Sequence, residues 1–401
     1  MGTNVYNTVD ILGNPSAVTN SVTRTGIRIT ILGLPTGVQG TYVGLIDRAP
    51  ATMDMGGRVD LTIAPAGTYT LKMNLSGLSA SASGSVVPTI DGATVPNVKG
   101  TAVFKRKVGQ SNLRLDFTVT DTGIMTAVLT DLQTVPLFAP CTGVRLAYSA
   151  TVNPPNPGDY TMLFDLRDPQ VGVLRIPQGN GFATMALAKD GKITGVGRTA
   201  DGNAFTLATI LGADGKMPVF ASFTPILGTL HGVPSLVPDI APNSYINGTV
   251  TWNKVAAPSP VRSLLYHEGF SPITMDVLGG RYLPVENGSV VRGLNNNADN
   301  ARLEFSEGGL LTSELDTLVL SITNPAPLKT TQVIGLPTNN PNKLTFVLPA
   351  KPAGSFNGKV DILNSRKDLV RNLTYQGVMA RVKDPNTSVI EWQAAGFVLV
   401  P

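Results

Sequence analysis

The sequence is poor in the residue types that most enzymes use for chemistry. It has one cysteine, Cys141, and two histidines, His231 and His267, in 401 residues. A single cysteine cannot form a disulfide within the chain, and we expect Cys141 to behave as a small buried apolar residue. Zinc sites usually need three or four His, Cys or carboxylate ligands at workable spacing, so we predict no metal site and no cofactor.

Charged residues are also scarce. They make up 14% of the chain, against about 25% in typical soluble domains, and the net charge is only +4. The densest basic run, Lys105-Arg106-Lys107, lacks the interleaved aromatic residues of a nucleic-acid-binding stripe. Long solvated helices need many Glu, Lys and Arg residues on their exposed faces. The composition therefore argues against long helices and against a nucleic-acid partner.

Long apolar runs are missing, and no signal-peptide pattern is visible in the first residues. No stretch approaches the about 18 consecutive apolar residues of a transmembrane helix. Aromatic residues make up 6% of the chain and do not form the regular girdles of a membrane β-barrel. The N-terminal residues 1–6 have neither the basic nor the apolar region of a signal peptide. We predict no membrane span, and we expect either a cytoplasmic protein or a fragment or mature form of a larger exported protein.

Glycine, proline and alternating strand patterns are what the chain has in abundance. It contains 42 Gly and 30 Pro, spread along its whole length. Polar and apolar residues alternate at 58–63, 112–119, 302–305 and 343–347, and each run meets a turn that contains Gly or Pro. Such alternation gives a strand one apolar and one polar face, as in antiparallel sheets. The pattern predicts an all-β protein.

Pairs of Asp or Asn followed by Gly predict tight hairpin turns, because both residues tolerate a positive φ. Six of these pairs are Asp190-Gly191, Asp201-Gly202, Asp214-Gly215, Asn247-Gly248, Asn287-Gly288 and Asn357-Gly358. The alternate acidic residues of a calcium loop do not accompany them.

A threefold internal repeat is the most informative feature of the sequence. A Gly-x-Tyr motif, expected at the start of a strand, occurs at residues 40–42, 158–160 and 280–282. A second marker, the glycine of the following turn, recurs at Gly67, Gly191 and Gly309. Both markers repeat after about 120 residues, a longer period than the roughly 20–50 residues of solenoid repeats. Each copy is long enough to form a small domain.

The repeat and the proline-rich joints at 153–157 and 258–260 divide the chain into four parts. We predict an N-terminal strand segment, residues 1–37, which contains an alternating strand at 25–31. Three tandem related antiparallel β-domains follow, at residues 38–140, 141–257 and 258–401. The sequence leaves open whether each is a small barrel or a sandwich with short turns.

Stretches of all three copies resemble a β-rich module of very large secreted bacterial surface proteins. These stretches are residues 40–45 and 55–62, then 179–184, 197–206 and 248–252, then 280–282, 300–306, 375–378 and 396–401. The resemblance implies an extracellular or cell-surface location. It carries no catalytic residues, because the motifs consist of turns and strands.

Catalytic arrangements are hard to assemble from the residues present. No Gly-x-Ser-x-Gly elbow, phosphate-binding loop or dinucleotide-binding fingerprint occurs. Carboxylate pairs that could serve a glycosidase, Glu304 with Glu307 and Asp165 with Asp168, lie in strands or turns where we expect surface charge. We therefore predict a protein that is not an enzyme, with no catalytic residues, although a glycan-active enzyme is kept as a third hypothesis.

Binding of a surface sugar is the alternative of a different class. Exposed aromatic rings beside amides and carboxylates are typical of such sites, and the first candidates are Trp252, Trp392 and Tyr282. Each tryptophan could instead belong to a core. The sequence thus favours a non-enzymatic surface protein of structural or adhesion type, with surface glycans or further copies of itself as partners. A carbohydrate-binding module of an exported polysaccharide-active system is the alternative.

Overall fold

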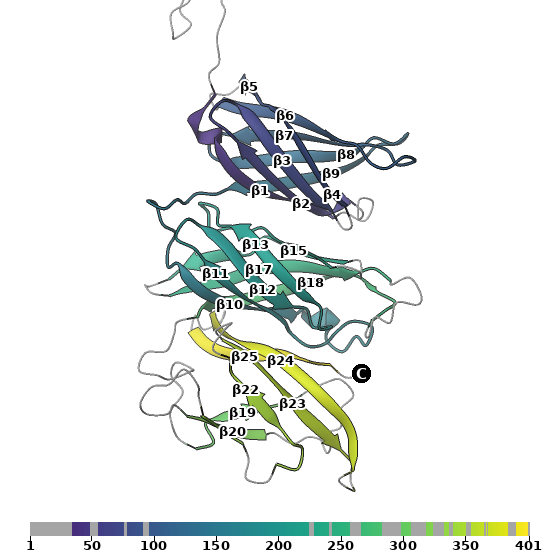
Figure 1. The fold of residues 1–401 in the computed structure, drawn as a ribbon, viewed down its shortest axis with the longest axis vertical. Coiled ribbons are helices and arrows are strands. Elements are labelled where there is room, and N and C mark those ends of the chain that lie inside the picture. The colour runs from purple at the N-terminus through teal and green to yellow at the C-terminus, as the bar shows by residue number, and fades with distance from the viewer. Residues whose placement is uncertain are drawn as a thin grey trace, which may run out of the picture.

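The computed structural model is built almost entirely from strands (Figure 1). It describes residues 34–48, 55–75, 78–90, 96–223, 228–239, 243–256, 266–282, 298–305, 318–323, 333–336, 340–349, 354–364, 366, 368–383 and 390–399. In this part of the chain the other regular elements are single turns, η1 (Thr36–Val38) and η3 (Asp168–Gln170). The predicted all-β class is confirmed. The predicted strand at 25–31 and the turn at Gly309 lie outside the described residues.

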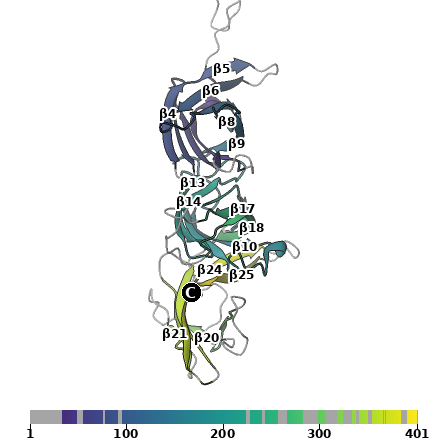
Figure 2. The ribbon, with the colours of Figure 1, turned by 90° about the vertical axis from the view of Figure 1, so that its right-hand side faces the viewer.

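The first sheet is a meander that curls into a nearly closed ring, and we call it the first barrel. Its strands are β1 (Gly40–Ile46), β2 (Gly57–Ile63), β3 (Thr68–Leu75), β4 (Leu78–Ser85), β5 (Val87–Ile90), β6 (Pro96–Phe104), β7 (Leu113–Thr120), β8 (Ile124–Asp131) and β9 (Leu137–Arg145). Strands pair antiparallel, and β9 returns to pair with β1. The ladder of described strands is interrupted between β4 and β5, so the barrel is nearly closed. Figure 2 shows its ring of strands.

Apolar side chains fill the interior of the first barrel. Along β7, Leu113, Leu115, Phe117 and Val119 are buried, while the residues between them are partly exposed. This is the alternation that the sequence predicts for residues 112–119. Cys141 is buried in the same core, as expected.

The second sheet repeats this design, and we call it the second barrel. Its strands are β10 (Gly158–Leu166), β11 (Gly181–Leu187), β12 (Lys192–Arg198), β13 (Ala204–Ile210), β14 (Val219–Phe223), β15 (Gly228–Gly232), β16 (Ser235–Pro238), β17 (Ser244–Lys254) and β18 (Phe270–Arg281). The last strand, β18, returns to pair with β10, and the interruption falls between β13 and β14. The sequence left barrels and sandwiches open, and these two sheets are barrel-like.

The first two Gly-x-Tyr motifs begin the first strand of each barrel, as predicted. Gly40 and Gly158 have φ of +126° and +145°, a conformation that L side chains rarely adopt. The hydroxyl groups of Tyr42 and Tyr160 each donate to the backbone carbonyl four residues earlier, at 2.8 and 2.6 Å. Both rings are buried, so each tyrosine connects the segment just before the first strand to the barrel core.

The third motif, Gly280-Arg281-Tyr282, lies at a strand end instead of a strand start. It ends β18, where Arg281 pairs opposite Tyr160. Arg145 occupies the equivalent place in the first barrel, opposite Tyr42. Each arginine donates to a backbone carbonyl just before the first strand. The motif therefore marks the end of the second barrel, because the last strand must return to the first to close the ring.

Strand pairing sets where the two barrels end. The first ends with β9 at Arg145 and the second with β18 at Arg281, whereas the predicted modules end at residues 140 and 257. Proline-rich joints suggested the earlier limits. However, Pro140 lies within β9 and pairs with Val128, and residues 270–281 are held to β10 by a full ladder.

Two smaller sheets follow the second barrel. One contains β19 (Ala301–Leu303), β20 (Leu318–Thr323) and β21 (Val333–Gly335). The other, which we call the C-terminal sheet, contains β22 (Thr345–Val347), β23 (Ser355–Leu363), β24 (Leu369–Lys383) and β25 (Ile390–Leu399). A core of Leu344, Phe356, Val360, Leu373 and Tyr375 packs beneath them.

The Asx-Gly pairs divide into two groups. Gly191, Gly202 and Gly215 have positive φ and lie in the turns after β11, β12 and β13, as predicted. The prediction is wrong for Asn247-Gly248 and Asn357-Gly358, which lie inside β17 and β23. Asn287-Gly288 lies outside the described residues.

The two barrels and the C-terminal sheet lie one after another along the long axis of the molecule (Figures 1 and 2). At the first junction, the guanidinium of Arg48 donates to the side chains of Asn253 and Thr229 of the second barrel. The backbone N–H of Ala147 donates to the carbonyl of Leu211 at 3.5 Å. Both faces of β1 are buried here, since residues 42–46 have no exposed member.

The second junction uses the corresponding strand of the second barrel. Both faces of β10 are buried between Tyr160 and Phe164, because β24 covers the outer face. The hydroxyl of Thr161 donates to the carbonyl of Met379 in β24 at 2.8 Å. The rings of Phe182 and Phe397 stack with centroids 6.1 Å apart. Side chains of β24 and β25 therefore join the core of the second barrel.

Candidate functional site

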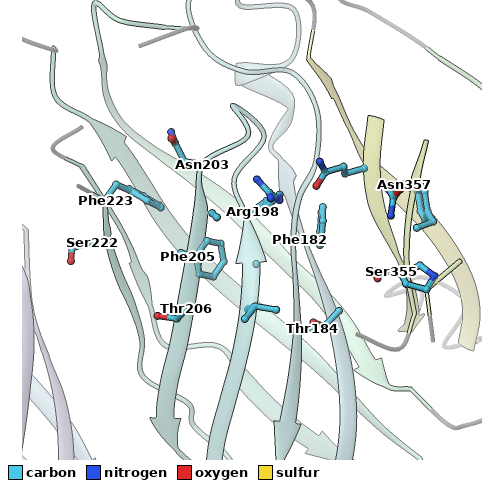
Figure 3. A pocket seen from close by; sticks show the side chains of 16 residues that line it. Phe182, Thr184, Arg198, Asn203, Phe205, Thr206, Ser222, Phe223, Ser355 and Asn357 are labelled. Atoms are coloured by element: carbon cyan, nitrogen blue, oxygen red, sulfur yellow. The ribbon is translucent and has the colours of Figure 1, made fainter. Parts of the chain in front are cut away.

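A cleft of about 700 Å³ lies between the second barrel and the C-terminal sheet (Figure 3). Its volume falls within the roughly 300–1,000 Å³ of small-molecule sites. The lining residues come from β11–β14 on one side and from β23 and β24 on the other. The cleft exists because the C-terminal sheet covers β10 and part of β11, and leaves the outer faces of β12 and β13 open.

Two cross-strand rows on the outer face of the second barrel form one wall. The first row is Phe182, Arg198 and Ala204, which pair across β11, β12 and β13. The second row, one step along the strands, is Thr184, Val196 and Thr206. Residues directly opposite one another in a ladder share a face of the sheet. Each row therefore places at least one apolar side chain next to a group that can donate a hydrogen bond.

Two amide side chains form the opposite wall. Asn357 of β23 and Gln376 of β24 are register partners, so both project from the same face of the C-terminal sheet. Asn357 is exposed and Gln376 is half-buried. Neither amide has a hydrogen-bond partner among the residues that the structure describes. Both remain able to donate to and accept from a ligand.

Phenylalanine rings supply the apolar lining, and glycine makes room for one of them. Phe182, Phe205, Phe223 and Phe356 all line the cleft and are each 6–7% exposed. A Cβ atom on Gly197 would lie 2.3 Å from the ring of Phe205, so only glycine fits at this position of β12. The rings are held by the cores on both sides, which gives the cleft a fixed apolar base.

Charge in the cleft is confined to one residue. Arg198 is the only charged side chain among the sixteen described lining residues. It is half-buried, and its Nη1 donates to the carbonyl of Gly202 at 2.9 Å. Figure 3 shows its guanidinium between Phe182 and Phe205.

The turn next to Arg198 carries a carboxylate, Asp201, whose charge is already compensated by a lysine. Asp201 is buried and accepts from Lys254 at 2.8 Å, from Thr199 at 2.5 Å and from Asn203 at 2.6 Å. The Lys254 and Asp201 side chains are 4% and 0% exposed. This pair fixes the turn between β12 and β13, which carries Asn203 to the rim of the cleft.

The aromatic residues predicted as sugar contacts lie elsewhere. Trp252 of β17 is 2% exposed and meets Phe270 edge-on, with centroids 4.8 Å apart. Tyr282 is 7% exposed, and its backbone N–H donates to the carbonyl of Asp159 at 2.8 Å. Neither presents a ring to solvent, because Trp252 lies in the core of the second barrel and the ring of Tyr282 packs next to Gly354. Trp392 lies in β25 opposite Arg381, and its side chain is outside the described residues.

The two histidines have structural surroundings. His231 of β15 is half-buried, and its Nδ1 lies 2.8 Å from the hydroxyl of Thr251. Burial, with a smaller contribution from the charge of Arg48, lowers the pKa of His231 to about 4. His267 is exposed in a turn before β18. No group of three or more His, Cys, Asp or Glu residues that could hold a metal occurs among the described residues.

One carboxylate pair does meet across a ladder. Asp165 of β10 lies opposite Asp276 of β18. Asp276 accepts from Arg167 at 2.8 Å, and Asp165 accepts from Asn180 at 2.7 Å. Glu304 is exposed, as predicted, and Glu307 lies outside the described residues. Asp165 and Asp276 are thus surface groups tied to an arginine and an amide.

Sequence reasoning missed the cleft residues. In the sequence, the stretches that contain Arg198, Asn203 and Gln376 indicate only turns and strands. The available signal was the pair of alternating strands at 192–198 and 204–210, where an arginine and two threonines occupy the polar face. The amides of the other wall come from about 150 residues later in the chain, and a sequence pattern does not bring them together.

Comparison with known proteins gives no relative. No protein family matches the chain, and neither a curated protein nor a solved structure matches it significantly. Among the described residues, no helix has the length and apolar character needed to cross a membrane.

Proposed function

We propose that the protein is a non-enzymatic structural or adhesion-type protein of the extracellular space or cell surface. It acts as a scaffold that holds β-barrels at fixed positions. The observation that carries this proposal is the pair of junctions, where both faces of the first strand of each barrel are buried. Side chains cross both junctions, through Arg48 at the first and Phe397 at the second. A chain of independent domains on flexible joints would not need such contacts.

The location and the lack of turnover are tested separately. Antibodies against the purified chain should label intact cells of the source organism without permeabilisation. The purified chain should release no product from a panel of glycans and esters above the buffer rate. Labelling that requires permeabilised cells would contradict the location. Hydrolysis at enzyme-like rates would contradict the scaffold assignment.

Binding of carbohydrate is the second candidate, and the cleft favours it. A sugar ring has apolar C–H faces and many hydroxyl groups. The cleft offers the matching groups, with the exposed Val196 beside Thr206, Asn357 and Gln376. A glycan array probed with the full chain tests this candidate. Binding that is lost in an Asn357→Ala, Gln376→Ala double variant supports it, and an array without any binding contradicts it.

Self-assembly of copies of the chain is a variant of the scaffold proposal. Outward-facing apolar side chains on the first barrel, such as Phe138 at 59% and Ile124 at 53% exposed, give it a physical basis. Light scattering over a range of concentrations should show a mass that rises with concentration. A constant monomer mass would remove this variant and leave the scaffold proposal in place.

A further inference from the structure

We propose that the cleft binds an acidic saccharide, and that Arg198 recognises the carboxylate of its ligand. This inference rests on the carbohydrate-binding candidate above and adds the charge of the ligand and the residue that reads it. The inference is argued from the two walls of the cleft and from the hydrogen bonds of Arg198, its one described cation. All of these residues are described by the structure.

The hydrogen-bonding state of Arg198 points to an anion. A guanidinium has five N–H donors in a planar fork that matches a carboxylate. Arg198 uses one of them inside the protein, toward the carbonyl of Gly202. The other donors have no partner among the described residues. Its register partners, Phe182 and Ala204, carry no charge.

The charges around Arg198 leave it uncompensated. No carboxylate occurs among the described residues that line the cleft. The nearest acidic residue in the sequence, Asp201, is buried and paired with Lys254. A half-buried cation beside phenylalanine rings lies in a lower dielectric than water, where an opposite charge is attracted more strongly. A ligand with one negatively charged group would therefore bind more tightly here than a neutral ligand of the same shape.

The rest of the lining favours a saccharide over other carboxylates. A fatty acid would need an apolar tunnel, but hydroxyl and amide groups line the cleft: Thr184, Thr206, Ser222, Asn203, Asn357 and Gln376. A phosphate group is usually held by several cations or by a cluster of backbone N–H groups. The cleft has one cation. Neutral donors and acceptors on both walls, with one guanidinium and an apolar base, match a hydroxyl-rich ring that carries one carboxylate.

The placement of these groups defines how such a ring would lie. Val196 is 49% exposed and lies two residues before Arg198 on the same face of β12, so an apolar sugar face and its carboxylate can contact neighbouring side chains. Asn357 and Gln376 face these side chains from the other wall and can bind the ring hydroxyl groups. The open outer faces of β12 and β13 leave room for further sugar units of a chain.

An array of acidic and neutral oligosaccharides, read with the full-length chain, tests the proposal. The array carries uronate and sialate oligosaccharides, the same compounds with their carboxyl groups reduced to alcohols, sulfated oligosaccharides, and Asp-rich peptides. We expect binding to carboxylate-bearing saccharides and at least about tenfold weaker binding to their reduced forms, the size of effect that a charged hydrogen bond gives.

Substitutions at Arg198 separate the role of this residue from general charge. Arg198→Gln should weaken binding of the best uronate or sialate by about tenfold or more, measured by calorimetry. Arg198→Lys should restore part of the affinity, since it keeps the charge and loses the fork. The matched control is Arg175→Gln, which removes one exposed charge of the second barrel outside the cleft and should leave affinity unchanged. Equal melting temperatures show that the variants fold.

Each other outcome has a definite meaning. Equal binding of acidic and reduced saccharides, unaffected by Arg198→Gln, would overturn this inference and leave the carbohydrate-binding candidate standing. Equal binding of sulfated saccharides would overturn the choice of a carboxylate, and equal Arg198-dependent binding of Asp-rich peptides would overturn the choice of a saccharide. An array with no binding would overturn both the inference and the carbohydrate candidate, but not the scaffold proposal.

Discussion

At the scale of single residues, the buried ion pair between Lys254 and Asp201 joins the stability of the second barrel to the shape of the cleft. The two groups lie 2.8 Å apart and are almost completely buried. Asp201 also holds Asn203, which lines the cleft. A buried pair is weak evidence of net stabilisation, because both charges lose hydration, but loss of one partner leaves the other uncompensated.

The Lys254→Met variant should therefore be strongly destabilised. We expect its free energy of unfolding to fall by about 3–5 kcal/mol, the usual result of breaking a buried pair. The double variant Lys254→Met, Asp201→Asn should recover most of this loss, because no buried charge is left. Urea unfolding measures all three chains. A single variant as stable as the double would contradict the account.

His231 makes stability depend on pH in a predictable direction. Its pKa in the folded chain is about 4, below the ordinary value of 6.5, because burial disfavours the charged ring. Between these two values the unfolded chain binds a proton that the folded chain does not. The free energy of unfolding should therefore fall as the pH is lowered from 6.5 toward 4, by up to about 3 kcal/mol from this residue.

The His231→Gln variant isolates this contribution. Urea unfolding of the natural chain and the variant at about pH 7 and about pH 4.5 gives the pH dependence of each. We expect a smaller loss of stability at the acidic pH in the variant. Identical losses in both chains would show that His231 is protonated as easily in the folded protein as in the unfolded one.

At the scale of structural elements, the two barrels share one closing device. A positive-φ glycine starts the first strand, a buried tyrosine caps a backbone carbonyl, and an arginine on the last strand sits opposite that tyrosine. The first strand meets both its neighbour in sequence and the last strand of its barrel. The start of the first strand is therefore where the barrel is closed by pairing with the last strand.

Removal of the two tyrosine hydroxyl groups should have matched effects. We expect Tyr42→Phe and Tyr160→Phe each to lower the free energy of unfolding by about 1 kcal/mol, the usual value for one hydrogen bond. Denaturant unfolding monitored by circular dichroism measures both. Tyr245→Phe is a control, because the Tyr245 hydroxyl has no hydrogen-bond partner among the described residues and its ring contact with Lys383 is kept by Phe. A loss confined to one barrel would contradict the shared design.

Local patterns predicted the strands well and their long-range pairing poorly. Alternation gave β2 and β7 to within a residue, since each has one face in a core. It could not show that the motif at 280–282 ends a strand, because the start and the end of a barrel lie side by side and carry similar residues. Turns were wrongly predicted at Asn247-Gly248 and Asn357-Gly358. Both pairs lie within strands, because pairing with neighbouring strands outweighs the local turn propensity.

The cleft could not be predicted because its walls meet only after folding. Trp252 and Tyr282 were the conspicuous aromatic residues, yet the side chains of both are buried. The residues that line the cleft are mainly phenylalanines, an arginine, amides and hydroxyl residues of ordinary appearance. The sequence specifies the polar face of β12, and the fold determines that this face lies opposite Asn357 and Gln376.

At the scale of the whole molecule, the proposed scaffold depends on fixed junctions between its units. Arg48 reaches from the first barrel to Asn253 and Thr229 of the second. The guanidinium of Arg58 similarly donates to the carbonyl of Ala208. A scaffold that holds binding surfaces at set distances needs such contacts, whereas a flexible string of domains does not.

The distance between the two barrels in solution tests this claim most directly. Spin labels at Ser81→Cys on β4 and Thr194→Cys on β12, both exposed positions, report that distance by pulsed electron resonance. Native Cys141 should stay unlabelled, because it is buried and burial raises the pKa of its thiol to about 12. As a comparison, Arg48→Ala should broaden the distance distribution, whereas Arg114→Ala, which removes an exposed ion pair with Asp116, should not.

The account predicts one narrow distance distribution for the doubly labelled natural chain, at the separation that the stacked barrels set. A broad or multiple distribution, unchanged by Arg48→Ala, would contradict it.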